Sequence, residues 1–298
     1  MNTKRKNKQY FLTVALTIFA GLTAIVFLMP TILTITNSFM TSSEISANYG
    51  VMFDNISADQ KTYISDTLNL KFIPDKVSFT QYFAVLFKSP EYLLKFWNSV
   101  ILVVPITFFQ IVVALFTSYG FARYDGKIKQ IIFFSYIILM LMPYQVTLVP
   151  NFLVADKIGL LNTRWSIILP GIFSPFSVFL LTKVMKRIPI SYIEAAKLDG
   201  ASEWQIFRHI CLPLCRSAIF SVTLLVFIDY WNMVEQPLIL LNDKEMHPLS
   251  VFLSEINTGD VGLAFAVAVI YMIPTLLMFL YGEDYLVEGI TYSGGIKG

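Results

Sequence analysis

The chain has 298 residues, of which 56% are hydrophobic and only 14% are charged, and its formal net charge is +2. Soluble domains carry about 25% charged residues, and a soluble chain of this length has too little interior to bury so much apolar surface. The composition therefore indicates an integral membrane protein and excludes a disordered or disulfide-stapled one. A nearly neutral charge balance gives no electrostatic reason to expect nucleic acid as a partner.

Six stretches are long and apolar enough to cross a lipid bilayer, which takes about 20 residues in a helix. In chain order they are Tyr10–Thr36, Asn98–Ala122, Gln130–Val154, Trp165–Met185, Ser217–Leu241 and Val261–Tyr281. The first is much longer than the apolar run of a cleaved signal peptide, so we expect it to remain as an anchor. The sequence therefore predicts an all-α integral membrane protein with six transmembrane helices.

Lysine and arginine are divided unevenly between the two sides of such a protein. With a cytoplasmic N-terminus, 14 of the 22 basic residues fall in cytoplasmic segments, as the positive-inside rule requires. We therefore expect residues 1–9 to be cytoplasmic, residues 10–282 to form the transmembrane domain and residues 283–298 to be a cytoplasmic tail. Both termini then face the cytoplasm. Within the domain, a long loop at about 37–97 is external and a loop at about 183–216 is cytoplasmic.

The external loop contains Ser78–Phe87, which is typical of a short amphipathic helix with a polar start. Two interpretations are open for this loop. It could be a small cap against the membrane face, or it could be a docking surface for an external partner.

The cytoplasmic loop carries two capping-box patterns, Ser191-x-x-Glu194 and Ser202-x-x-Gln205. They predict a first helix at Tyr192–Leu198 and a second that runs to about Ile210. Gly200 lies between them, where a glycine in the left-handed conformation ends a helix. A loop that only connects two spans does not need this fold.

The small side chains of Ala195 and Ala196 would let another protein approach the first helix of this loop closely. The sequence around them, Glu194-Ala-Ala-Lys-Leu-Asp-Gly200-Ala-Ser followed by Ile210-Cys-Leu-Pro213, resembles the EAA loop of permeases in binding-protein-dependent ABC importers. The segments Asn98-Ser99, Tyr119–Arg123 and Leu160–Thr163 are also similar to the sugar permeases of that family. The tail Tyr285–Gly298 is similar to the ending of the carbohydrate branch, in particular to the six-span permease of the maltose importer.

The resemblance implies a permease subunit that moves a carbohydrate, of oligosaccharide type, across a bacterial-type cytoplasmic membrane by alternating access. It implies four kinds of partner besides the lipid bilayer: a second homologous permease, a dimer of a cytosolic ABC ATPase, ATP with Mg²⁺ on that ATPase, and an extracellular substrate-binding protein. The chain has no G-x-x-x-x-G-K-[ST] phosphate loop, so we expect neither a cofactor nor enzymatic activity in it. A permease for a non-sugar cargo, or a stand-alone channel, is the alternative.

The resemblance also implies roles for individual residues. Contact with the ATPase is expected for one set, which consists of Glu194, Ala195, Ala196, Asp199, Gly200, Leu212 and Pro213. Further contacts with the ATPase are expected for Gly294, Gly295 and Lys297 in the tail.

Polar and aromatic residues inside the predicted fifth span are candidates for the substrate pathway, because ionisable groups at membrane depth are costly and usually functional. They are Asp229, Tyr230, Trp231, Asn232 and Glu235, with Tyr144 and Gln145 of the third span as a second cluster. Sugar sites combine hydrogen-bonding groups with aromatic faces. The alternative interpretation is a polar network buried between helices.

A metal site is not predicted. His209, Cys211 and Cys215 lie within seven residues, but no fourth ligand is near them in the sequence.

Overall fold

The computed structural model describes residues 2–49, 69–255 and 261–294, and within these ranges it is helical and has no β-strand. The predicted all-α class is therefore confirmed. The chain divides into two compact units, which are described separately. Unit 1 combines Met1–Tyr92 with Glu255–Ile270, and unit 2 combines Leu93–Ser254 with Tyr271–Gly298.

The described residues hold four to six candidate membrane spans. Four stretches qualify by themselves, namely Tyr10–Asn37, Pro90–Arg123, Trp165–Met185 and Leu263–Tyr285. Two further spans exist if each of two bent helix pairs counts as one: Lys127–Met140 with Tyr144–Lys157, bent by 104°, and Glu203–Leu214 with Arg216–Trp231, bent by 75°. Most candidate spans begin and end near the predicted boundaries, with two exceptions. The second begins eight residues before Asn98, and the fifth, Glu203–Trp231, begins 14 residues before Ser217 and ends 10 residues before Leu241.

Three of the predicted spans are broken rather than continuous, and proline accompanies each break. Pro143 separates α5 (Lys127–Met140) from α6 (Tyr144–Lys157), since the residue before a proline avoids the helical conformation. Pro175 begins α8 (Pro175–Met185) after α7 (Trp165–Gly171), and the Ser174 hydroxyl caps α8 by accepting the Ser177 N–H at 3.3 Å.

The third break divides the predicted span Ser217–Leu241. Its first part is α12 (Arg216–Trp231), and its second part is the short helix α13 (Glu235–Leu240). Pro237 lies in the first turn of α13, where its missing N–H is not needed. The prediction of one continuous helix here was wrong, because an apolar composition does not show where a helix changes direction.

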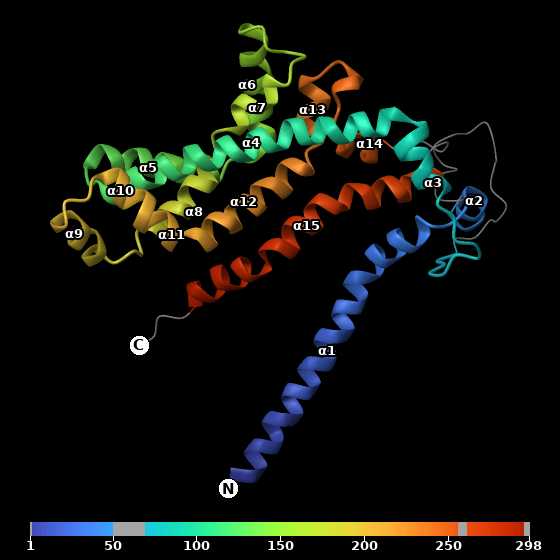
Figure 1. The fold of residues 1–298 in the computed structure, drawn as a ribbon, viewed down its shortest axis with the longest axis horizontal. Coiled ribbons are helices and arrows are strands. Elements are labelled where there is room, and N and C mark those ends of the chain that lie inside the picture. Colours follow the sequence, from blue (N-terminus) through green and yellow to red (C-terminus); the bar gives the residue numbers. More distant parts are fainter. Residues whose placement is uncertain (1, 50–68, 256–260, 295–298) are drawn as a thin grey trace. The chain divides into compact units, whose positions relative to one another are not determined.

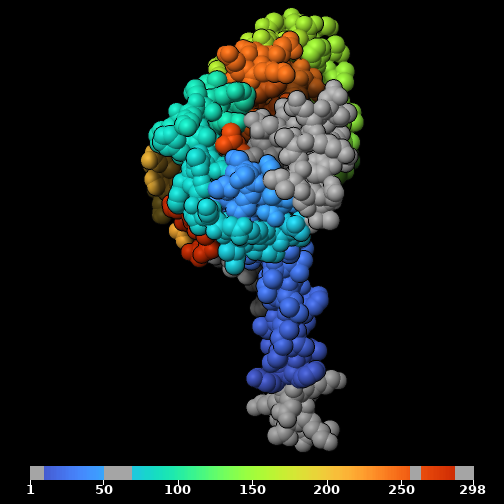
Figure 2. Space-filling model, turned by 90° about the vertical axis from the view of Figure 1, so that its right-hand side faces the viewer, coloured from blue at the N-terminus to red at the C-terminus, as the bar shows by residue number. Residues whose placement is uncertain are grey.

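Unit 1 contains α1 (Asn2–Asn37), α2 (Ser42–Tyr49), α3 (Thr80–Phe83) and the π-helical turn η3 (Ala84–Lys88), so the predicted helix near Ser78–Phe87 is present. Tyr49 packs with Met40, Ile45 and Phe265 in a small core. Figure 2 shows α2, in blue, next to the chain that follows residue 69, in cyan. There the Lys71 ammonium lies 3.0 Å from Glu44 and 2.5 Å from Asp75. The carboxylates of Asp75 and Glu44 raise the pKa of Lys71.

Unit 2 is a bundle around α4 (Pro90–Arg123). Figure 1 shows α5 beside α8 and α8 beside α12, and these pairs are in contact. The short helices α6, α7 and α13 pack together. The main core consists of buried residues of α4, α7 and α12 and of the chain after α12, among them Leu102, Ile106, Ile167, Trp231 and Leu241. The rest of the unit includes α14 (Leu249–Ser254) and most of α15 (Val261–Gly294).

A polar junction holds the chain after α13 onto α4. The Asn98 amide donates to the backbone carbonyls of Glu245 at 2.5 Å and His247 at 3.2 Å, and its oxygen accepts from the Arg164 guanidinium at 2.8 Å. The neighbouring Ser99 hydroxyl accepts the Leu249 N–H at 2.9 Å. These bonds fix the ends of the short helices, whose backbone groups would otherwise lack partners.

Candidate functional site

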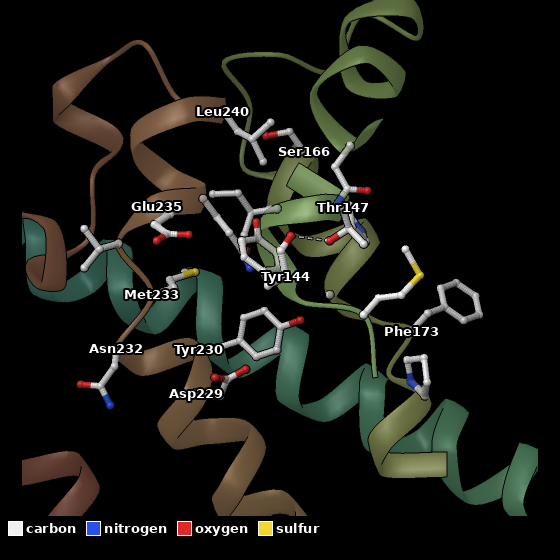
Figure 3. A pocket seen from close by; sticks show the side chains of 18 of the residues that line it. Tyr144, Thr147, Ser166, Phe173, Asp229, Tyr230, Asn232, Met233, Glu235 and Leu240 are labelled. Atoms are coloured by element: carbon white, nitrogen blue, oxygen red, sulfur yellow. Dashed lines mark hydrogen bonds between the residues drawn. The ribbon is translucent and has the colours of Figure 1, made fainter. Parts of the chain in front are cut away.

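An open cleft of about 930 Å³ lies in unit 2 where the broken helices meet. Residues of α6, α7, α12 and α13 line it, together with residues at the three helix breaks. Four ionisable groups, Tyr144, Asp229, Tyr230 and Glu235, gather around the opening (Figure 3). Smaller polar groups complete the polar lining; they are Thr147, Asn151, Ser166, Asn232 and Gln236.

The helix breaks explain why polar groups face this cleft. Asp229 lies in the last turn of α12 and Glu235 is the first residue of α13, so both carboxylates project near helix ends instead of into a packed interface. Both side chains are exposed to the cleft. Gly171 of α7 leaves room for the ring of Tyr230, since a Cβ there would lie 3.2 Å from the Tyr230 hydroxyl and 3.0 Å from Ile106.

The structure brings five of the seven pathway candidates to the cleft, from both predicted clusters: Tyr144, Asp229, Tyr230, Asn232 and Glu235. Gln145 is exposed but does not line the cleft. Thr147 and Asn151, which were not predicted, line it with Tyr144. A signal for them was present, because they follow Tyr144 by three and seven residues and so share its face of a helix.

Trp231 is placed elsewhere, and this corrects its assignment to the pathway. It is 1% exposed and stacks on Phe227 and Tyr271, with ring centroids 5.3 and 5.6 Å away. Its indole N–H donates to the Tyr271 carbonyl at 3.0 Å. Successive residues of a helix point about 100° apart, so Tyr230 can face the cleft while Trp231 faces the core.

Tyr271 also orders the end of α12. Its hydroxyl lies 2.7 Å from the Trp231 carbonyl and 2.8 Å from the amide oxygen of Asn232. Asn232 is therefore held at the edge of the cleft by a residue of α15.

The loop at residues 183–216 forms two helical segments joined at Gly200, as predicted. The first, α9 (Ile190–Leu198), begins two residues earlier than expected, with Pro189 as its cap residue and no side-chain cap. The predicted capping box at Ser191 was therefore wrong, because Ser191 lies inside the helix. Gly200 has φ +81°, the left-handed conformation predicted for it. The second capping box is present, with the Ser202 N–H donating to Gln205 Oε1 at 2.8 Å.

The second half of the loop consists of α10 (Glu203–Ile206), the π-helical turn η4 (Phe207–Cys211) and α11 (Leu212–Leu214). Pro213 is exposed and Leu212 is half-buried. Cys211 and Cys215 are buried in the core of the loop. Within the residues described, no three metal-binding side chains come together.

The outer face of α9 differs in two respects from the predicted one. Ile193 is buried and holds the helix on the loop, whereas Glu194, Ala195 and Asp199 are exposed. Ala196 is half-buried and packs against the core of the loop, so it contributes less to the outer face than Ala195 does. Leu198 was not among the predicted ATPase contacts, yet its side chain is 89% exposed. Leu198 follows Glu194 by four residues, so the two share one face of the helix, and this spacing could have indicated its exposure.

Glu203 fastens the loop to α4. Its carboxylate lies 2.7 Å from the Lys197 ammonium of α9 and accepts a hydrogen bond from the Tyr119 hydroxyl of α4 at 2.5 Å. Beside it, Phe207 stacks on Phe116 of α4 with a centroid distance of 5.2 Å. The loop and the C-terminal end of α4 therefore pack as one body.

The tail of the chain is described only in part. The helix α15 continues without interruption to Gly294, past residue 282 where the membrane domain was expected to end. Gly295 and Lys297 lie outside the described residues.

Comparison with known proteins adds to this geometry. A family model described as "Binding-protein-dependent transport system inner membrane component" matches residues 110–287. The chain is 28% identical to the arabinooligosaccharides transport system permease protein AraQ of Bacillus subtilis (strain 168), with 96% of each chain covered. It is 30% identical to the lactose transport system permease protein LacG of Rhizobium radiobacter, over 67% of this chain and 74% of that protein.

The fold also has a counterpart among solved structures. A crystal structure of a bacterial ABC transporter involved in the import of the acidic polysaccharide alginate contains a chain that superposes with a TM-score of 0.75 at 20% sequence identity. The match covers 94% of this chain and 98% of the other. At this identity the likeness concerns the fold alone.

Proposed function

The chain belongs to the family of binding-protein-dependent transport system inner membrane components, and from this premise we propose that it is the permease subunit of an ATP-driven importer for an oligosaccharide. It is a multi-pass protein of the cell membrane. The cleft carries the proposal, because it combines tyrosine rings with hydroxyl, amide and carboxylate groups at helix breaks. Its volume lies in the range of small-molecule sites, and the relatives named above transport oligosaccharides or a disaccharide.

The proposed transporter contains four further polypeptides. They are a second, homologous permease, two copies of a cytosolic ATPase and an external substrate-binding protein. ATP and Mg²⁺ bind to the ATPase, so this chain contributes no enzymatic step. The exposed face of α9 and the tail residues Gly294, Gly295 and Lys297 are the proposed ATPase contacts. Support comes from the exposure of Glu194, Ala195 and Leu198 on a small folded loop.

Transport proceeds in this proposal by alternating access, in which ATP binding shifts an equilibrium between outward-open and inward-open states. The ATPase acts on α9, and Lys197 passes the displacement to Glu203 and then to Tyr119 of α4. The residues of α4 also belong to the core that borders the cleft. A movement of α4 therefore changes the opening between α7, α12 and α13.

The proposed topology has six spans, both termini in the cytoplasm, residues 37–97 outside and residues 183–216 inside. A cysteine at Ser202 should react with a membrane-impermeant maleimide only in inverted membrane vesicles, and a cysteine at Asp75 only in right-side-out vesicles. Both positions are exposed. Cys211 and Cys215 are replaced by alanine to remove background labelling. Reaction of Ser202→Cys from outside would contradict the topology.

The cargo pathway is tested by replacing Tyr144 with alanine in the assembled transporter in proteoliposomes. We expect uptake of the transported oligosaccharide to fall about tenfold, because the sugar loses an aromatic face worth about 1 kcal/mol and a hydroxyl partner. Tyr124→Ala is the matched control, since Tyr124 is exposed and lies outside the cleft. Equal uptake by the two variants would exclude Tyr144 from the pathway.

A further inference from the structure

The charged side chains that line the cleft are all acidic. Of the residues that line it in the described part of the chain, Asp229 and Glu235 are the charged ones, and none is a lysine, arginine or histidine. The remaining polar groups are hydroxyls and amides. The cleft thus has negative charge and no positive charge to balance a bound anion.

No contact within the described residues neutralises the two carboxylates, although Glu235 lies in the first turn of α13, where the helix dipole favours a negative charge. Among the described residues, neither forms a salt bridge, and both side chains are exposed to the cleft. Asp229 lies in the last turn of α12, where the helix dipole disfavours a negative charge. Local helix stability therefore gives no reason for an aspartate there, and its position on the cleft does.

How well these carboxylates allow a saccharide to bind depends on the charge of that saccharide. A neutral saccharide offers hydroxyl groups, which donate to carboxylates in strong, charge-assisted hydrogen bonds. A uronate saccharide brings one carboxylate per residue, and each would leave water without gaining a cationic partner. Repulsion by Asp229 and Glu235 adds to this cost, because like charges at short range repel each other.

We propose that this cleft selects neutral oligosaccharides and rejects oligosaccharides of uronic acids. The inference rests on the proposed function and adds the chemical class of the cargo. The structural counterpart, by contrast, belongs to an importer of an acidic polysaccharide. A shared fold places the cleft, while the residues that line it determine the charge of the cargo.

The test uses the assembled transporter and pairs of matched tetrasaccharides. Within a pair, each sugar unit carries either a hydroxymethyl or a carboxylate group. The pairs are built from glucose and glucuronate, galactose and galacturonate, and mannose and mannuronate. Equilibrium dialysis without the binding protein measures affinity for the membrane subunits alone. We expect the neutral member of the best-bound pair to bind at least about tenfold more tightly. Glu235→Lys should reduce or invert this ratio, and Asp229→Asn should reduce it less.

Asp156→Asn is the control variant, because Asp156 is an exposed carboxylate of α6 that does not line the cleft. It should leave the ratio unchanged. Equal affinity for both members of a pair, or a ratio that Glu235→Lys does not alter, would overturn the inference on charge. Uptake of the same saccharides into proteoliposomes with the binding protein is measured in parallel. If no saccharide of the panel is bound or taken up, the proposed carbohydrate function fails instead.

Discussion

Replacing Trp231 with alanine should destabilise the protein by about 3–5 kcal/mol, the range found for large aromatic residues in well-packed cores. The side chain is 1% exposed and lies against Phe96, Phe227 and Tyr271, so its removal leaves a cavity. The Tyr271 carbonyl also loses its indole donor. We expect a lower yield of folded transporter and a lower midpoint of thermal unfolding in detergent.

Two further variants separate packing from a direct role in transport. Trp231→Phe keeps most of the ring volume and should cost about 1–2 kcal/mol, mainly through the lost hydrogen bond. Trp165→Ala removes an indole that is 54% exposed and should change stability by less than about 0.5 kcal/mol. If Trp231→Ala were as stable as the wild type but failed to transport, the residue would belong to the pathway after all.

Replacing Gly200 with valine should uncouple ATP hydrolysis from transport. Gly200 has φ +81°, and a β-branched residue in this conformation is strained by about 1–3 kcal/mol. Relief of the strain changes the turn between α9 and α10 and so moves the outer face of α9. We expect the number of saccharides transported per ATP hydrolysed to fall about tenfold, while the spans remain inserted. Proteoliposomes with the ATPase, the binding protein and saccharide measure both rates.

Gly159→Val is a matched control for backbone strain. Gly159 has φ +69°, and neither glycine has atoms within 4 Å of the position where a Cβ would lie. Both variants therefore carry comparable strain without a clash, but Gly200 lies in the loop at residues 183–216 and Gly159 does not. We expect Gly159→Val to lower stability by a similar amount and to keep its coupling. Normal coupling in Gly200→Val, or an equal loss in both, would exclude the turn at Gly200 as the coupling element.

The α-helical class and the approximate positions of the spans follow from composition and run length. A stretch of about 20 apolar residues has few stable alternatives in a bilayer, because its backbone groups must bond within the helix. The turn at Gly200 and the capping box at Ser202 were equally predictable, since each depends on residues close in the sequence. The box at Ser191 was not, because Pro189 takes the cap position.

The tertiary structure alone decided which polar residues share the cleft. Tyr144 and Asp229 are 85 positions apart, and they line one opening because α6 and α12 are both interrupted beside α7 and α13. The tertiary structure alone also decided that Glu203 contacts Tyr119, and that the side chain of Trp231 points into the core. Composition states that a residue is apolar or polar. It does not state which face of a broken helix packs against its neighbours, because that depends on contacts between segments distant in the sequence.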